Sequence, residues 1–225
     1  MIRQLSERIG FSYALELLEL KSGLKDNARF VVSESNLPTY YKILKPLGLR
    51  MALSQFAVVP VESKSNVKVP EYNDYMRRVS KNSAAKDKHF IMYVSSKDPL
   101  VLAENETNHI AMGRLLGYPE CCIQDFAVRA QNSNKESVKL LFNDLALLHS
   151  KSDLRAHPFL MNLLYKDDSI KLLSHVPFSL ECEKSRKLAS MRFNLLENID
   201  PFCADEIAEK LRGTHYHNGS RFEFF

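Results

Sequence analysis

Three of the four cysteines fall in two short segments whose residue types and spacing could support chemistry. Cys121 and Cys122 end the segment GRLLGYPECC at residues 113–122, and Cys182 ends the segment HVPFSLEC at residues 175–182. In both segments the cysteines follow a proline, which favours the first turn of a helix. A helix N-terminus stabilises negative charge, and the thiolate is the form of cysteine that reacts and binds metals. The two segments therefore predict a thiol site.

Histidine and glutamate side chains could complete this site. Glu106 and His109 lie three residues apart on a helix expected over residues 99–116, so they would share a helix face. His175 comes shortly before Cys182. If the two helix starts converge, cysteine and histidine would surround one point, as they do in zinc sites and some iron sites. The predicted metal ligands are Cys122, Cys182, His109 and His175.

Two other interpretations of the cysteines stay open. Adjacent cysteines on a helix point about 100° apart, so Cys121 and Cys122 are not both expected to bind one ion without distortion. In a thiol-dependent enzyme, Cys121 or Cys122 would be the nucleophile, with His109 or His175 as its base. Glu106 would orient the base. In an interaction protein the cysteines would only be packed, because free cysteine is often buried as a small hydrophobic residue. The sequence names no reaction.

Composition limits the classes of protein. The chain has 225 residues, of which 45% are hydrophobic and 26% charged, as in soluble globular proteins. Lys and Arg number 31 and Asp and Glu 27, and the net charge of +4 is too small to indicate nucleic acid as a partner. No apolar run approaches the roughly 18 residues of a membrane helix, and no signal peptide is recognised. We expect a cytoplasmic protein with reduced cysteines and no membrane partner, with a small-molecule substrate left open.

The periodicity of apolar residues, together with glycine and proline, predicts an α+β fold. Residues 1–97 are expected to form an α/β part with a short sheet, which includes a mobile, charge-rich linker at about 62–88. Residues 98–225 are expected to be mainly helical and to end in a hairpin at Asn218 and Gly219. The two parts are expected to share one core. Helices are expected over residues 4–20, 36–47, 99–116, 119–130, 135–149, 179–196 and from 200, and strands over 29–33, 50–61 and 89–94.

The cysteine segments resemble a known family. Residues 116–122 (LGYPECC), with Phe126 just beyond, and the later His-x-Pro segment ending in Cys resemble the prokaryotic family called domain of unknown function 483. The resemblance covers residues 98–192 and implies no established activity. The second segment of this family typically reads His-x-Pro-Cys-Ser-x-x-Cys, whereas here Phe178 stands at the first of its two cysteines and Cys182 at the second. The resemblance therefore implies a mixed Cys/His site, for zinc or iron, or a lost site.

The two cysteine segments are also expected to pack against each other. Tyr118 and Phe178 would line the junction, because burying each aromatic side chain contributes on the order of 1.5–3 kcal/mol. If Cys122 and Cys182 share one zinc ion, their sulfurs must lie within about 4 Å of each other.

Overall fold

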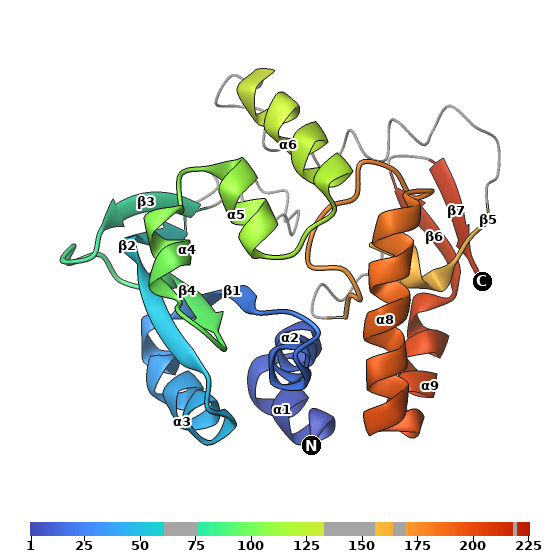
Figure 1. Ribbon diagram of the computed structural model, residues 1–225, viewed down its shortest axis with the longest axis horizontal. Coiled ribbons are helices and arrows are strands. Elements are labelled where there is room, and N and C mark those ends of the chain that lie inside the picture. The colour runs from blue at the N-terminus through green and yellow to red at the C-terminus, as the bar shows by residue number, and fades with distance from the viewer. Residues whose placement is uncertain (61–75, 133–155, 164–169, 218–219) are drawn as a thin grey trace. The chain divides into compact units, whose positions relative to one another are not determined.

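The computed structural model of the chain describes residues 1–60, 76–132, 156–163, 170–217 and 220–225, and it has an α+β fold, as predicted (Figure 1). Contacts divide the chain into two compact units. Unit 1 comprises residues 1–19, 118–129 and 140–225, and unit 2 comprises residues 20–117 and 130–139. The expected helix over residues 135–149 lies outside the described residues.

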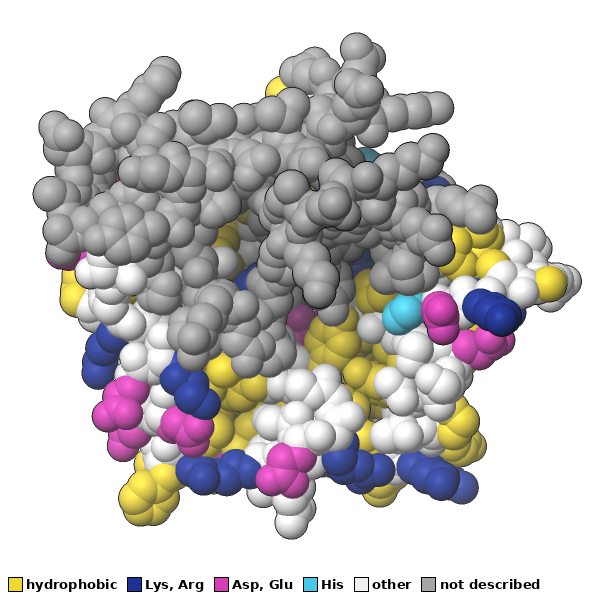
Figure 2. All heavy atoms as spheres, turned by 180° about the vertical axis from the view of Figure 1, so that it is seen from behind, with side chains coloured by type: hydrophobic (Ala, Val, Ile, Leu, Met, Phe, Trp, Pro, Cys, Tyr) yellow, Lys and Arg dark blue, Asp and Glu magenta, His cyan; other side chains and the backbone are white. Residues whose placement is uncertain are grey.

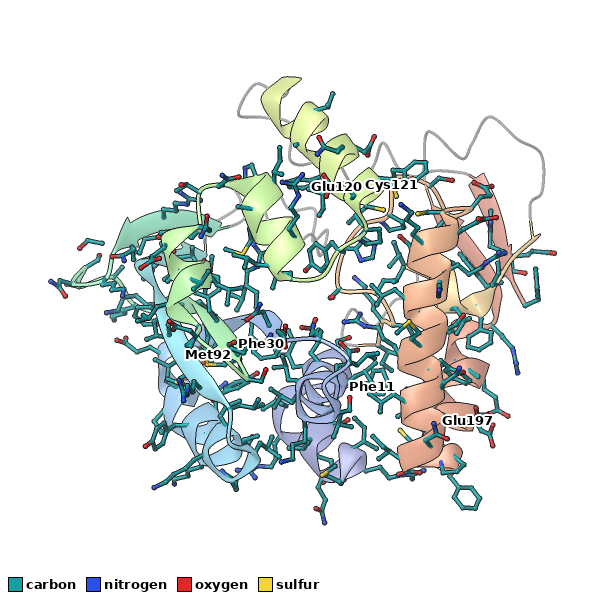
Figure 3. The ribbon with its side chains drawn as sticks, in the orientation of Figure 1. Phe11, Phe30, Met92, Glu120, Cys121 and Glu197 are labelled. Carbon is teal, nitrogen blue, oxygen red and sulfur yellow. The ribbon has the colours of Figure 1, made fainter. Side chains whose placement is uncertain are left out.

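Unit 2 is built on a four-stranded antiparallel sheet with the strand order β1-β4-β2-β3. Residues along β1 are alternately buried, because successive side chains of a strand point to opposite faces. Phe30 of β1 and Met92 of β4 pair in register on the buried face, and Figure 3 labels both. The strands are β1 (Asn27–Ser33), β2 (Arg50–Pro60), β3 (Met76–Ser80) and β4 (His89–Ser95).

A helix closes the buried face of this sheet. The 3-10 turn η1 (Glu34–Asn36) leads into α3 (Leu37–Leu47), which places Tyr40 with its ring centroid 6.1 Å from that of Phe30. Helix α3 ends at Gly48, whose φ of 71° lies in the left-handed region that glycine adopts readily. The predicted strands and helix of this part are therefore confirmed.

Strand β3 falls inside residues 62–88, which the sequence suggested as a mobile linker. Its residues pair with β2 in antiparallel register, from Phe56 opposite Ser80 to Pro60 opposite Met76. The many charged residues of this segment suggested a linker. They are compatible with an edge strand, however, because one side of such a strand has no neighbouring strand and charged side chains are common there. Residues 62–75 of the expected linker lie outside the described residues.

The single helix expected over residues 99–116 is in fact two helices, α4 (Leu100–Glu104) and α5 (His109–Leu115). The side chain of Asn108 accepts a hydrogen bond from the backbone N–H of Ala111 at 3.0 Å. This N-cap satisfies an N–H at the start of α5 and so begins a new helix.

The break separates Glu106 from His109. Glu106 lies in the turn before α5, where its carboxylate accepts hydrogen bonds from the Gln55 backbone N–H and the Tyr93 hydroxyl, each at 3.3 Å. His109 is the first residue of α5. The prediction that the two residues share one helix face was therefore wrong.

Unit 1 consists mainly of helices. The helix expected over residues 4–20 is divided at Gly10, whose φ of 83° interrupts the helical backbone. Helices α8 and α9 are joined at Asp200, which caps α9 by accepting a hydrogen bond from the Cys203 backbone N–H at 3.0 Å. The described helices of this unit are α1 (Ile2–Ile9), α8 (Glu183–Ile199) and α9 (Pro201–Leu211). Helix α2 (Phe11–Ser22) belongs to it up to residue 19, and helix α6 (Glu120–Asn132) up to residue 129.

The predicted C-terminal hairpin is confirmed. Strands β6 (Gly213–His217) and β7 (Ser220–Phe224) are antiparallel, and β5 (Ala156–His157) lies parallel to β7 on its other side. The 3-10 turn η2 (Phe159–Met161) follows β5 and contributes Met161 to the hydrophobic core.

The core of unit 1 includes the N-terminal helices. Ile2 and Leu15 are buried in one hydrophobic cluster with Leu196 of α8 and Leu211 of α9. For this reason residues 1–19 belong with the cysteine-bearing helices, and the units do not follow the expected division into residues 1–97 and 98–225. That the whole chain shares one core stays a prediction.

The described surface carries charges of both signs. In the described part of the face in Figure 2, basic and acidic side chains lie beside one another along the lower edge. Among the described helices, none combines the length and the apolar character that a membrane crossing requires.

Candidate metal centre

Cys121 and Cys122 lie in the first turn of α6. Gly117, with a φ of 75°, turns the chain, and Tyr118 and Pro119 lead into the helix. The backbone N–H of Cys122 donates to the Pro119 carbonyl at 2.9 Å, so the helical pattern begins at the proline, as the sequence predicted. Figure 3 labels Cys121 beside Glu120 at this end of α6.

Cys182 is the N-cap residue of α8, which begins one turn later than predicted. The expected cap, Ser179, instead stabilises the turn before the helix. Its hydroxyl accepts a hydrogen bond from the Glu181 backbone N–H at 3.1 Å, and its carbonyl accepts one from the Cys182 N–H at 3.0 Å. Local side-chain hydrogen bonds of serine compete with the helix in this way. As a result, Cys182 lies at the helix N-terminus itself.

The three cysteine sulfurs converge. The Sγ–Sγ distances are 3.7 Å for Cys122 and Cys182, 3.8 Å for Cys121 and Cys182, and 4.0 Å for Cys121 and Cys122. All three cysteines are free, and together they form a group that could hold a metal ion. The expected approach of Cys122 and Cys182 to within about 4 Å is confirmed. We call these three residues the cysteine cluster.

The participation of both adjacent cysteines corrects one expectation from the sequence. The angle of about 100° between neighbouring residues on a helix describes the direction of their Cα–Cβ bonds. Rotation about χ1 then moves each sulfur between separate staggered positions, so two adjacent thiols can still approach each other. Cys121 and Cys122 do so in the first turn of α6.

His175 supports the cluster through an intermediate residue and is not a member of it. Its Nε2 lies 2.9 Å from the Ser185 hydroxyl, which in turn lies 3.3 Å from the sulfur of Cys122. The His175 ring is tilted against that of Tyr118, with centroids 5.0 Å apart, and the Tyr118 hydroxyl donates to the Ser174 carbonyl at 3.0 Å. The His175 ring thus contacts Tyr118 and is hydrogen-bonded to Ser185, and the Ser185 hydroxyl lies beside the sulfur of Cys122.

The surroundings shift the pKa values of two of the thiols, Cys122 and Cys182, in opposite directions. Burial raises the pKa of Cys122 to about 12, although the Ser185 hydroxyl and the Phe178 backbone N–H act in the opposite direction. Burial also opposes ionisation of Cys182, but hydrogen bonds from Ser185 and from the two neighbouring thiols outweigh it and lower the pKa of Cys182. Of these two thiols, Cys182 is therefore the more acidic, and it lies at the N-terminus of α8, where the helix dipole favours a negative charge.

His109 and Glu106 belong to unit 2, whereas the cysteine cluster and His175 belong to unit 1. Burial lowers the pKa of His109, and the positive charges of Arg29 and Arg78 act in the same direction. Neither residue is among the potential ligands of the cluster, whose described members are all cysteines. A role for His109 as ligand or base, and for Glu106 as its partner, stays a prediction.

The predicted aromatic junction is confirmed for one residue only. Tyr118 contacts His175 and Ser174, between the two cysteine segments. Phe178 keeps 39% of its surface exposed, so it is only partly buried, less than expected. Its backbone N–H faces the Cys122 sulfur instead. Cys203 is buried in the core of unit 1, as expected for a packed cysteine.

Two residues around the cluster were missed in the sequence. Ser185 follows Cys182 by three residues, the separation at which a side chain faces the N-cap of a helix. Arg192 lies two turns further along α8 and donates to Ser174 at 3.0 Å, beside His175. The spacing of Ser185 was a usable signal, whereas the partners of Arg192 lie far away in the sequence.

Removing the Ser185 hydroxyl should weaken metal binding without unfolding the protein. In Ser185→Ala, His175 and Cys122 both lose a hydrogen bond, and such partners of metal ligands typically contribute about 10–100-fold in affinity. Competition titration with a zinc indicator measures the change. Ser190→Ala is the matched control, because the Ser190 hydroxyl only donates to the Arg186 carbonyl within α8. Equal affinity in both variants would contradict a role for Ser185.

Comparison of the chain with models of protein families, with curated proteins and with solved structures finds no match in any of the three. The resemblance to the domain of unknown function 483 therefore stays a prediction, and the geometry of the cysteine cluster carries the functional interpretation.

Proposed function

We propose that the protein binds one thiophilic metal ion, zinc in the first place, through Cys121, Cys122 and Cys182. The observation that carries this proposal is the set of three Sγ–Sγ distances of 3.7, 3.8 and 4.0 Å. Metal–sulfur bonds of about 2.3 Å at tetrahedral angles place two sulfurs about 3.8 Å apart. The three sulfurs are therefore spaced as the ligands of a single ion would be.

The donor set supports zinc over other common ions. Mg²⁺ and Ca²⁺ prefer oxygen ligands, whereas thiolates select zinc, copper(I) and iron. In a four-iron cluster each cysteine binds a different iron ion, so its cysteine sulfurs lie farther apart than the ligands of a single ion. The two segments that suggested the family resemblance are the same segments that supply these three sulfurs, and we retain that resemblance as part of the proposal.

Metal analysis of the protein tests this proposal directly. Protein without a polyhistidine tag, purified anaerobically and supplied with zinc, should retain about one zinc per chain after gel filtration. Cys121→Ser, Cys122→Ser and Cys182→Ser should each lose far more affinity than the roughly 10–100-fold expected for a lost hydrogen-bonding neighbour. Cys203→Ser is the matched control, because this buried cysteine lies outside the cluster, and it should retain zinc. Less than about one tenth of an equivalent in the unaltered protein would refute the proposal.

Zinc affinity should rise with pH. Cys122 has a pKa raised to about 12 by burial, so it is protonated near neutral pH and must release its proton when zinc binds. Each unit of pH lost therefore lowers the apparent affinity about tenfold from this residue alone. Cys182, with its lowered pKa, adds to the slope mainly at lower pH. Competition titrations between about pH 6 and pH 8 measure the slope, and a flat profile would mean that Cys122 is not a ligand.

A thiol-dependent enzyme without metal is the second candidate, favoured by the lowered pKa of Cys182. A nucleophile needs a thiolate and access for a substrate. Cys182 is buried, and the ring of His175 contacts Ser185 instead of a cysteine. Alkylation of the metal-free protein by iodoacetamide, followed over pH, tests this candidate. Faster labelling of Cys182 than of Cys121 at neutral pH would support it, and labelling of Cys182 only after unfolding would exclude it.

A further inference from the structure

We infer that the metal ion of the cysteine cluster takes an external thiol as its fourth ligand, so that the site binds a thiol-bearing small molecule or a cysteine of a partner as its thiolate. This inference rests on the proposed function.

The chain supplies three sulfurs to the cluster and has no fourth cysteine for it. All four cysteines lie in the described residues, and Cys203 is packed in the core of unit 1. Within the described residues no histidine or carboxylate joins the group, and the Nε2 of His175 bonds to Ser185, which lies between the ring and Cys122. Phe178, whose backbone N–H faces Cys122, contributes no ligand atom from its side chain. Structural zinc sites have four protein ligands, whereas sites with three leave a position for another molecule.

Cys121 is the least buried member of the cysteine cluster. Cys122 and Cys182 are buried, but Cys121 is only partly buried. A ligand from solvent would therefore reach the ion most directly on the side of Cys121.

The charge of the site favours a thiol over water as this ligand. Three neutral histidines leave a zinc ion with its full charge, which lowers the pKa of bound water to about 7. Three thiolates instead reduce a divalent ion to a net charge of about −1, so bound water is activated much less. A thiol is intrinsically more acidic than water, and coordination removes its proton outright. A soft, sulfur-rich ion also prefers a further soft ligand.

The binding step is balanced without any oxidant or reductant. The S–H bond of the external thiol breaks, its proton goes to solvent, and a sulfur lone pair forms the bond to the metal ion. The three cysteine sulfurs remain bound, and no atom changes its oxidation state. The result is a thiolate held at neutral pH, which is the nucleophilic form of the external molecule.

Cobalt(II) substitution tests the inference, because the near-ultraviolet sulfur-to-cobalt absorption grows with the number of bound thiolates. Protein kept reduced with a phosphine, so that no thiol is present beforehand, is loaded with cobalt and titrated with 2-mercaptoethanol or L-cysteine. We expect the absorption per cobalt to rise by about one third, from three sulfurs to four, with about one proton released per thiol bound. The matched alcohols, ethylene glycol and L-serine, should cause no rise.

The outcomes distinguish this inference from the proposed function. Cobalt bound with three-sulfur absorption that saturating thiol leaves unchanged would overturn the inference and leave the metal site intact. Four-sulfur absorption before any thiol is added, or removal of cobalt by the thiol, would also overturn it. Absence of any sulfur-to-cobalt absorption would instead refute the metal site itself. Cys203→Ser should respond as the unaltered protein does, and Cys121→Ser should lose the three-sulfur starting point.

Discussion

Zinc at about a thousandfold excess over its dissociation constant should raise the free energy of unfolding of the metal-free protein by about 4 kcal/mol. A ligand that binds only the folded state stabilises it by this amount through mass action. For a chain of this size the stabilisation corresponds to a rise in melting temperature of roughly 2–4 °C per kcal/mol, or about 10 °C in total. Thermal unfolding followed by circular dichroism, with and without zinc, measures the effect.

Variants assign this stabilisation to the cysteine cluster. Cys182→Ser removes one of the three sulfurs of the cysteine cluster and should abolish the shift produced by zinc. Cys203→Ser, which removes a buried thiol outside the cluster, should be less stable overall because it places a hydroxyl in an apolar core. It should nevertheless keep the full shift with zinc. A zinc shift that survives in Cys182→Ser would place the metal elsewhere on the chain.

Replacement of Arg192 by methionine should cost about 3–5 kcal/mol of stability, because it leaves a buried carboxylate without its partner. The guanidinium binds Glu19 through two contacts of 2.6 and 2.7 Å, and both side chains are almost completely buried. Arg192 also donates to the Leu172 carbonyl at 2.7 Å and to the Ser174 hydroxyl at 3.0 Å. It therefore ties α2 to α8 and to the segment just before His175.

Two further variants identify the cause of this loss. Removing both charges, in Glu19→Leu combined with Arg192→Met, should recover part of the stability, since the Glu19 carboxylate is then no longer buried without its partner. The recovery should be incomplete, because the buried carboxylate of Glu16, 4.0 Å from Arg192, still loses this neighbour. Arg186→Met, at an exposed position of the same helix, should change the stability by less than about 0.5 kcal/mol. Urea unfolding of the unaltered protein and of the three variants measures these differences. A double variant as unstable as Arg192→Met alone would show that the loss comes from packing and not from the unpaired charge.

Much of the local structure could be predicted from the sequence because the signals are local. The strands at Asn27–Ser33, Arg50–Pro60 and His89–Ser95 follow from runs of β-branched and aromatic residues, and the C-terminal hairpin follows from an Asn-Gly pair. Proline at the start of α6 and the capping residue of α9 marked helix starts correctly. One continuous helix was predicted across Gly10 and another across Asn108. At both residues the helix is interrupted, although the amphipathic pattern of the sequence continues beyond them.

The grouping of the chain in space could not be predicted in the same way. The burial of Ile2 and Leu15 with Leu196 depends on contacts between residues far apart in the sequence, for which periodicity contains no information. The buried pair of Glu19 and Arg192 is equally hidden, because both residue types are usually exposed.

The candidate site was predicted in part. The convergence of Cys122 with Cys182 followed from two proline-led helix starts that each carry cysteine. The inclusion of Cys121 depends on side-chain rotation, which the spacing of residues along a helix does not specify. The place of His175 depends on Ser185, which occupies the position between the histidine ring and the sulfur of Cys122. A sequence pattern shows which residues have suitable chemistry but not which of them stands between two others.

X-ray absorption spectroscopy at the zinc edge tests the central claim most directly, because it reports the atoms bound to the ion. For protein purified without added thiol and loaded with one equivalent of zinc, the account predicts a first shell dominated by about three sulfur atoms at about 2.3 Å. The shell should lose one sulfur in Cys121→Ser and should be unchanged in Cys203→Ser. A first shell of nitrogen and oxygen at about 2.0–2.1 Å, with no sulfur, would contradict the account.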